Sequence, residues 1–142
     1  MAWPQIRKKL TWVAAFIGVA ISVVWFFDIY RQPQMVARIL NIPSPPGSLR
    51  VVECESPVTT DVLTTCSVEI SPDDFPLLLV GYHFEQIPAK GTSHTLGLPK
   101  VGPEFAVDVE FSVQPAEFKH GGFVRVLTDK DRRHAIVDLY IE

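Results

Sequence analysis

The chain has 142 residues, 47% of them apolar, and its 13 basic and 16 acidic side chains give a formal net charge of −3. Residues 1–40 carry five basic and one acidic side chain, whereas residues 41–142 carry eight basic and fifteen acidic ones. An acidic domain is a poor partner for nucleic acid, because binding to phosphates requires a surface rich in Lys and Arg. The length beyond the first forty residues suffices for one folded domain and excludes a second.

An uncharged, strongly apolar segment of eighteen residues runs from Leu10 to Phe27. At about 1.5 Å per helical residue it can cross most of the ~30 Å hydrocarbon core of a membrane. Trp12 near one end, and Trp25 with Tyr30 near the other, fit the aromatic belts of the two membrane interfaces. We therefore predict a transmembrane anchor helix over residues 10–30.

Basic residues precede this segment, and positively charged flanks stay in the cytoplasm; they are Arg7, Lys8 and Lys9. Arg31 and Arg38 on the other side weaken this asymmetry. We predict that residues 1–9 are cytoplasmic and that the protein crosses the cell (inner) membrane once, with its C-terminal domain periplasmic or otherwise extracytoplasmic. A cleaved signal peptide would require small residues near the end of the segment, where this chain has bulky ones. The uncleaved anchor is the preferred interpretation.

Three small residues, Ala14, Gly18 and Ser22, follow one another at intervals of four within the span. They share one face of a helix and would let another helix approach closely. Because small residues are common in such segments, a helix that faces only lipid is the alternative. The pattern indicates helix packing against other transmembrane helices, against a membrane protein complex, or against a second copy of the chain.

Residues 31–47 are predicted to form an interfacial helix followed by a proline-rich linker. Pro33 suits a first helical turn, and four apolar residues then recur at helical spacing, which favours a short helix on the membrane surface; they are Met35, Val36, Ile39 and Leu40. The prolines from Pro43 to Pro46 end this helix, because proline lacks the backbone donor.

Beyond residue 47 the apolar period changes from helical to two. The clearest case is Phe105 to Val113, where large apolar residues alternate with small or acidic ones, as in a half-buried strand. Weaker alternation predicts five more strands, over 49–55, 62–70, 77–86, 122–128 and 135–141, with a long loop over 87–103. We predict an all-β fold for residues 48–142, a small antiparallel β-sandwich (Ig-like), with a small open barrel as the alternative.

The two cysteines, Cys54 and Cys66, both point toward the apolar side of their strands. If the first two strands form a hairpin around Thr60, Cys54 lies opposite Cys66 and Val52 opposite Val68. The predicted oxidising compartment favours a disulfide over two free buried thiols. A bond that closes a loop of this length would stabilise the fold by ~3 kcal/mol in the chain-entropy model.

No recognisable catalytic or metal-binding pattern emerges. The four histidines show no ligand spacing, and Ser93 with His94 is interpreted as part of a solvated loop; the histidines are His83, His94, His120 and His134. The turn at Asp73 and Asp74 lacks the Asp-x-Asp-x-Asp-Gly pattern of a calcium loop, although an acidic turn could hold that ion weakly. We expect no cofactor, no resident metal and no enzymatic activity.

The run from Phe75 to Val80 has no polar residue, so one of its faces needs a cover. A strand buried on both faces, or covered by the loop 87–103, is one interpretation; a contact surface for a protein or a membrane is the other. The sequence therefore predicts a non-catalytic, membrane-anchored accessory subunit or interaction module of a membrane protein complex. Two alternatives stay open: a tethered domain that binds a small ligand or metal, and an extracytoplasmic enzyme.

Overall fold

A computed structural model describes residues 3–57, 61–96 and 99–142, with the side chains of residues 3–10 and 28 left aside. The predicted cytoplasmic charges of Arg7 to Lys9 and the predicted turn at Thr60 lie outside these described parts. The chain divides into two compact units, one ending at Arg31 and the other beginning at Gln32. Each unit is described by itself below.

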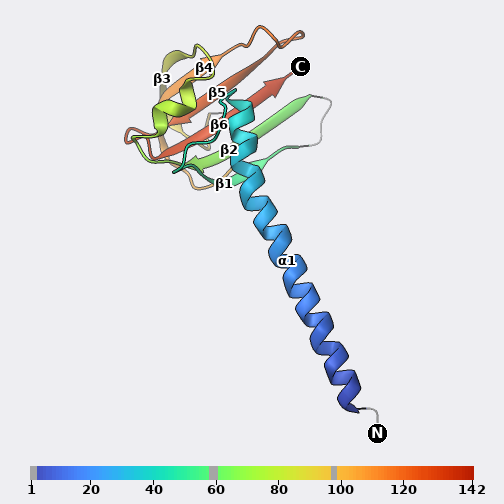
Figure 1. The fold of residues 1–142 in the computed structure, drawn as a ribbon. Helices are drawn as coiled ribbons and strands as arrows, with labels where there is room; N and C mark the ends of the chain where they lie inside the picture. The colour runs from blue at the N-terminus through green and yellow to red at the C-terminus, as the bar shows by residue number, and fades with distance from the viewer. Residues whose placement is uncertain (1–2, 58–60, 97–98) are drawn as a thin grey trace. The chain divides into compact units, whose positions relative to one another are not determined.

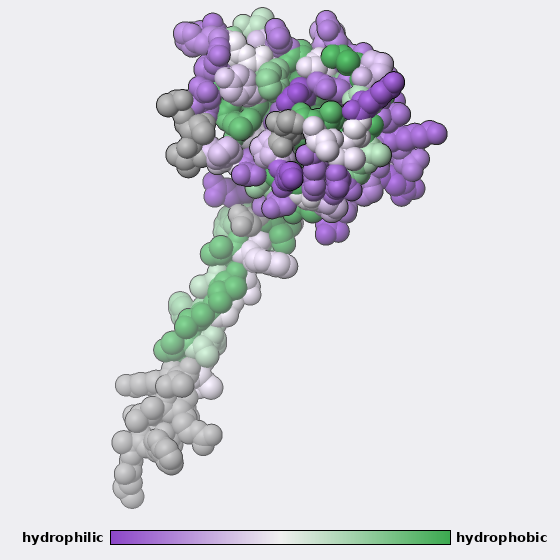
Figure 2. Space-filling view, turned by 180° about the vertical axis from the view of Figure 1, so that it is seen from behind, coloured by the Kyte–Doolittle hydropathy of each residue, from purple (hydrophilic) through white to green (hydrophobic). Residues whose placement is uncertain are grey.

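Helix α1 runs from Trp3 to Ile39 and contributes to both units. In the first unit its large apolar side chains are exposed, with Trp12 at 74% and Phe16 at 77%. Among the described residues, α1 is the one helix long and apolar enough to cross a membrane. This finding confirms the predicted N-terminal apolar helix. Figure 2 shows the span as a run of mostly apolar side chains, while polar side chains dominate the visible surface of the second unit.

The second unit contains one sheet of six antiparallel strands in the order β1-β2-β6-β5-β4-β3 (Figure 1). The strands are β1 (Arg50–Glu55), β2 (Val62–Glu69), β3 (Glu85–Thr92), β4 (Ala106–Val113), β5 (Gly122–Thr128) and β6 (His134–Ile141). Strands β3 to β6 follow one another as a meander, and the β1–β2 hairpin joins them through the pairing of β2 with β6. The all-β antiparallel class is confirmed. An Ig-like sandwich is not, since the six strands form a single sheet.

The predicted disulfide joins Cys54 on β1 to Cys66 on β2, whose Cα atoms lie 4.1 Å apart as directly opposed residues. The predicted pairing of Val52 with Val68 is wrong, because Val51 takes that place. A β-bulge between Val51 and Glu53 inserts one residue into β1. Such a bulge reverses the face of every residue before it, so Val51 and Cys54 both pack on the main core.

One face of the sheet carries the main core, and the C-terminal end of α1 packs on it. Val36 and Leu40 are fully buried, together with Val126 of β5 and Val137 of β6. The apolar stripe that we expected to lie on a membrane surface is therefore buried in the interior of the β-domain. Asn41, with φ at 54°, ends the helix in the left-handed conformation that Asn tolerates better than most residues.

A 3-10 helix, η1 (Phe75–Leu79), replaces the strand predicted over 77–86. Pro76 stands in its first turn, where a missing N–H costs nothing. Phe75 and Leu78 are buried in the main core, whereas Leu77 is 48% exposed and Val80 66% exposed. Most of β3 lies where a loop was predicted over 87–103. Pro88 and a second bulge before Gly91 interrupt the alternation by which a strand is recognised in a sequence.

The opposite face of the sheet carries a smaller apolar cluster. Leu127 of β5 and Ile136 of β6 pack there against Val107 and Val101. Glu53 helps to hold the loop that contains Val101, because its Oε2 accepts a hydrogen bond from the backbone N–H of Gly102 at 2.7 Å. The sheet is thus covered on one face by helix and on the other, in part, by a loop.

Candidate functional site

An open groove lies along the span of α1, with a volume of about 510 Å³. Its lining consists of Gly18 and Ser22 together with five larger or apolar neighbours, Ala15, Val19, Val23, Phe26 and Phe27. A side chain added at Gly18 would meet nothing within 4 Å. Gly18 and Ser22 line this groove together with Ala15, whereas Ala14 does not, and packing of this face against another helix stays a prediction.

The hydroxyl of Ser22 donates a hydrogen bond to the backbone carbonyl of Gly18 at 2.8 Å. Serine and threonine satisfy their hydroxyls in this way on helices. The hydroxyl proton of Ser22 is therefore satisfied within the helix, which lowers the cost of packing an apolar surface against it.

The aromatic residues predicted for the membrane interfaces are all largely exposed. Trp12 is 74%, Trp25 72% and Tyr30 62% exposed. The ring of Tyr30 has one close aromatic neighbour, Phe26, with the ring centres 4.7 Å apart. These positions are compatible with belts at either end of a span, and their contact with lipid stays a prediction.

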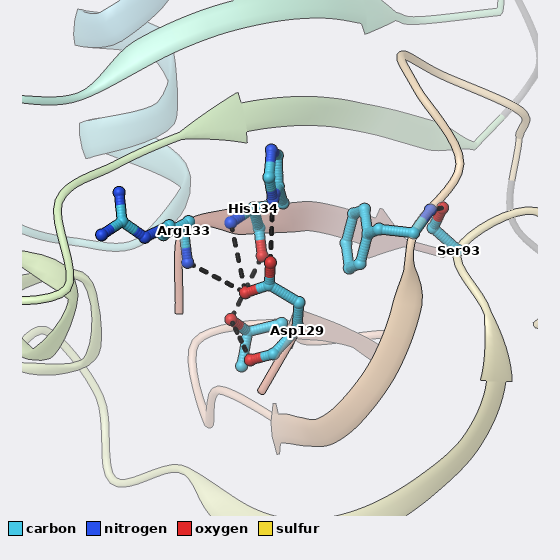
Figure 3. A network of polar contacts seen from close by, with 6 residues as sticks. Ser93, Asp129, Arg133 and His134 are labelled. Atoms are coloured by element: carbon cyan, nitrogen blue, oxygen red, sulfur yellow. Dashed lines mark hydrogen bonds and ion pairs between the residues drawn. The ribbon is translucent and has the colours of Figure 1, made fainter. Parts of the chain in front are cut away.

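Among the described histidines, His134 has the most developed polar contacts (Figure 3). Its Nδ1 lies 2.8 Å from Oδ2 of Asp129, and the other oxygen of that carboxylate accepts the backbone N–H groups of Arg133 and His134 at 2.9 and 3.3 Å. Asp129 and His134 flank the turn between β5 and β6. The carboxylate therefore caps the hairpin between β5 and β6.

This Asp–His pair is not completed by a nucleophile at Ser93. The ring of Phe105 lies against the imidazole of His134, with the centres 5.9 Å apart. The hydroxyl of Ser93 accepts the backbone N–H of Phe105 at 3.1 Å, and Ser93 is 1% exposed. Ser93 is thus a buried residue that holds a loop, which corrects the expected solvated loop, and the three side chains form no charge-relay chain.

The other histidines lie apart. His83 and His120 are exposed, and a ring nitrogen of His94 lies 3.0 Å from the carbonyl oxygen of Gly102. Within residues 3–57, 61–96 and 99–142, no three His, Cys, Asp or Glu side chains gather as a metal site would require. At the acidic turn, Oδ2 of Asp74 accepts the hydroxyl of Ser48 at 2.6 Å, so this carboxylate serves the turn itself.

A buried ion pair on the second face of the sheet was missed by the sequence reasoning. Asp138 of β6 is fully buried; its Oδ1 accepts the hydroxyl of Thr65 at 2.7 Å, and its Oδ2 accepts Nε and Nη2 of Arg125 at 3.2 and 2.8 Å. The guanidinium also lies over the ring of Phe123, 4.4 Å from its centre. In the sequence, Arg125 in β5 and Asp138 in β6 each stand between two apolar residues. This pattern was the available sign of a buried ion pair.

This cluster holds strands together rather than presenting a reactive group. Thr65, Arg125 and Asp138 come from three neighbouring strands, β2, β5 and β6. Breaking one partner of a buried pair typically costs ~3–5 kcal/mol, since it leaves the other charge uncompensated. Both oxygens of Asp138 already accept protein donors, so the carboxylate has a structural use.

Comparison with known proteins gives no relative from which a function could be inferred: no family model matches the chain, and neither a curated protein nor a solved structure does. The functional argument therefore depends on the surfaces and contacts of the chain itself.

Proposed function

We propose that the chain is a non-catalytic, membrane-anchored accessory subunit or interaction module of a membrane protein complex. The groove at Gly18 and Ser22 is the observation that carries this proposal. Helices in lipid associate mainly through close van der Waals packing, which small residues permit. In this proposal the span packs on another transmembrane helix through the face of Ala14, Gly18 and Ser22.

The membrane is the cell (inner) membrane in this proposal, with the N-terminus cytoplasmic and the β-domain periplasmic or otherwise extracytoplasmic. The disulfide between Cys54 and Cys66 supports this orientation, because stable disulfides belong mostly to oxidising compartments. Trp12, Trp25 and Tyr30 then lie at the two interfaces.

The β-domain would bind a protein partner on the same side. Leu77, within η1, and Val80, directly after it, support this part of the proposal, since they are 48% and 66% exposed. Exposed apolar side chains that are close together are typical of interaction surfaces. Changing both to Asp should reduce recovery of the partner from solubilised membranes, whereas Ile87→Asp, at a 45% exposed position on β3, should not.

The groove is tested by one pair of variants in the full chain. Gly18→Leu fills the groove, whereas Ala20→Leu places the same side chain two residues away, about 200° around the helix. Particle mass is measured in mild detergent after solubilisation of the native membrane. We expect a complex for the wild type and for Ala20→Leu, and a smaller particle for Gly18→Leu. A lone monomer for the wild type at every detergent concentration would contradict the proposal.

A further inference from the structure

A second cavity lies within the β-domain, beside the C-terminal end of α1, and has a volume of about 260 Å³. Its walls are apolar and come from α1, from β6 and from the loop between β4 and β5; they include Met35, Ile39, Phe118, Leu139 and Ile141. The volume is near the ~300 Å³ lower end of small-ligand pockets. The cavity suits a slender apolar group rather than a bulky, polar molecule.

Polar groups join the apolar walls. Arg38 lines the cavity and is exposed, and no carboxylate within the described residues lies within ion-pair distance of it. Tyr82 and Thr64 are further polar residues of the lining. Burial and then the nearby Glu117 carboxylate raise the pKa of Tyr82, which therefore keeps its proton at neutral pH. An apolar cavity with one unpaired cation and a phenol matches an amphiphile with an acyl chain and an anionic head.

The chain itself limits how far this cavity can lie from the membrane, if α1 is a membrane anchor as proposed above. Met35 is four residues beyond Arg31, the last residue of the first unit. Four residues span at most ~14 Å even when fully extended, whatever the orientation of the two units. The walls of the cavity therefore stay within reach of lipid headgroups.

We propose that this cavity binds one acyl chain of an anionic membrane phospholipid, with its phosphate at Arg38. The acyl chain packs among Met35, Phe118 and Leu139, and Arg38 supplies the compensating charge. The inference depends on the proposed anchor and adds to it a ligand class and a site.

The test uses the full chain in nanodiscs made of equal parts phosphatidylglycerol and phosphatidylcholine. Protein released into mild detergent is examined by native mass spectrometry for retained lipid. We expect one retained lipid per chain, predominantly phosphatidylglycerol. Arg38→Gln should reduce the preference for phosphatidylglycerol about fivefold, the factor that corresponds to ~1 kcal/mol for one basic residue at a membrane surface.

Two variants fill the cavity from different walls, Met35→Trp from α1 and Ile141→Trp from β6. Both should abolish lipid retention, while Ile87→Trp, on an exposed part of β3, should leave it unchanged. Retention that is the same in all three Trp variants, or equal retention of the two lipids by the wild type, would overturn the proposal.

Extraction of membranes with alkaline carbonate separates this failure from failure of the anchor. A chain that stays in the membrane pellet but retains no lipid refutes only the cavity proposal. A wild-type chain that leaves the pellet refutes the anchor and the cavity proposal together.

Discussion

The two parts of helix α1 are both apolar, yet their surroundings differ. Up to Arg31 the large side chains are exposed, such as Phe16 at 77%, whereas beyond it Val36 is fully buried, as is Leu40 directly after the helix. The sheet covers the second part; nothing in the described chain covers the first. Apolar surface gains about 25 cal/mol for each Å² removed from water. The comparison teaches that the two parts of one helix differ in their apolar surroundings. The core of the β-domain buries the second part, whereas the first part would need a membrane or another protein to remove it from water.

The largest effect is expected where charge enters the first part. Ile17→Asp combined with Ile21→Asp places two carboxylates in the middle of the span, at ~2.5–3.5 kcal/mol each for membrane insertion. The double variant should move from the membrane pellet to the soluble or aggregated fraction in carbonate extraction. Ile17→Leu with Ile21→Leu is the control and should stay in the pellet. If the Asp variant stays there too, the first part does not depend on lipid.

Truncation should distinguish the two parts by stability. Leu40→Ala removes buried methyl groups and should lower the free energy of unfolding of the β-domain by ~2–5 kcal/mol. Val19→Ala shortens a side chain that is 63% exposed and should leave that free energy unchanged. Pulse proteolysis in urea on the detergent-solubilised chain measures both. Equal losses would show that the first part also packs on protein.

Two glycines, Gly18 in the exposed part of α1 and Gly81 beside the buried end, differ in the space around them. A Cβ added at Gly81 would lie 1.9 Å from the carbonyl oxygen of Leu40, whereas one added at Gly18 would meet nothing within 4 Å. Gly81→Ala should therefore destabilise the β-domain by ~1–3 kcal/mol through overpacking. Gly18→Ala should not change its melting temperature. A harmless Gly81→Ala would mean that the end of α1 packs more loosely on the turn after η1.

The smallest effect concerns pH and Tyr82, which lines a cavity together with the second part of α1. Burial and Glu117 raise the pKa of Tyr82 above its ordinary value of 10.0. The folded state then holds this proton more tightly than the unfolded state, so the contribution of Tyr82 to stability is constant below about pH 10 and is lost as the pH rises toward the folded pKa. Denaturation at successive pH values above 10 should show a shallower decline for Tyr82→Phe than for the wild type. Parallel declines would assign the loss to other groups.

Much of the fold could be predicted because alternation is a direct consequence of strand geometry. The strand over Gly122 to Thr128 has the predicted bounds, and Cys54 faces Cys66 as expected. The bulge at Val52 could not be foreseen, since an inserted residue leaves no mark in composition. Strand β3 was missed because Pro88 and Gly91 interrupt the alternation that identifies a strand.

The candidate sites were predictable to different degrees. Gly18 and Ser22 could be assigned to one face of the helix because helical spacing alone places them there, and both line the groove. The ion pair of Arg125 with Asp138 depends on which strands are neighbours, and the order of strands in a sheet is not written in local patterns. The sequence showed that Val36 and Leu40 form an apolar stripe, but we expected a membrane surface to cover it, whereas the sheet does. Helical periodicity shows which residues share a face and does not show what packs against that face.

The two outer strands of the sheet are poor templates for another strand. Unpaired edges invite edge-to-edge aggregation unless they are interrupted by bulges, prolines or charges. On β1 the bulge after Val51 is followed by the exposed Glu53, and on β3 Pro88 lacks a donor and precedes a second bulge. Copies anchored in a membrane, as proposed above, would thus resist polymerising through their sheets. A protein that docks on this domain would have to recognise side chains instead of extending the backbone ladder.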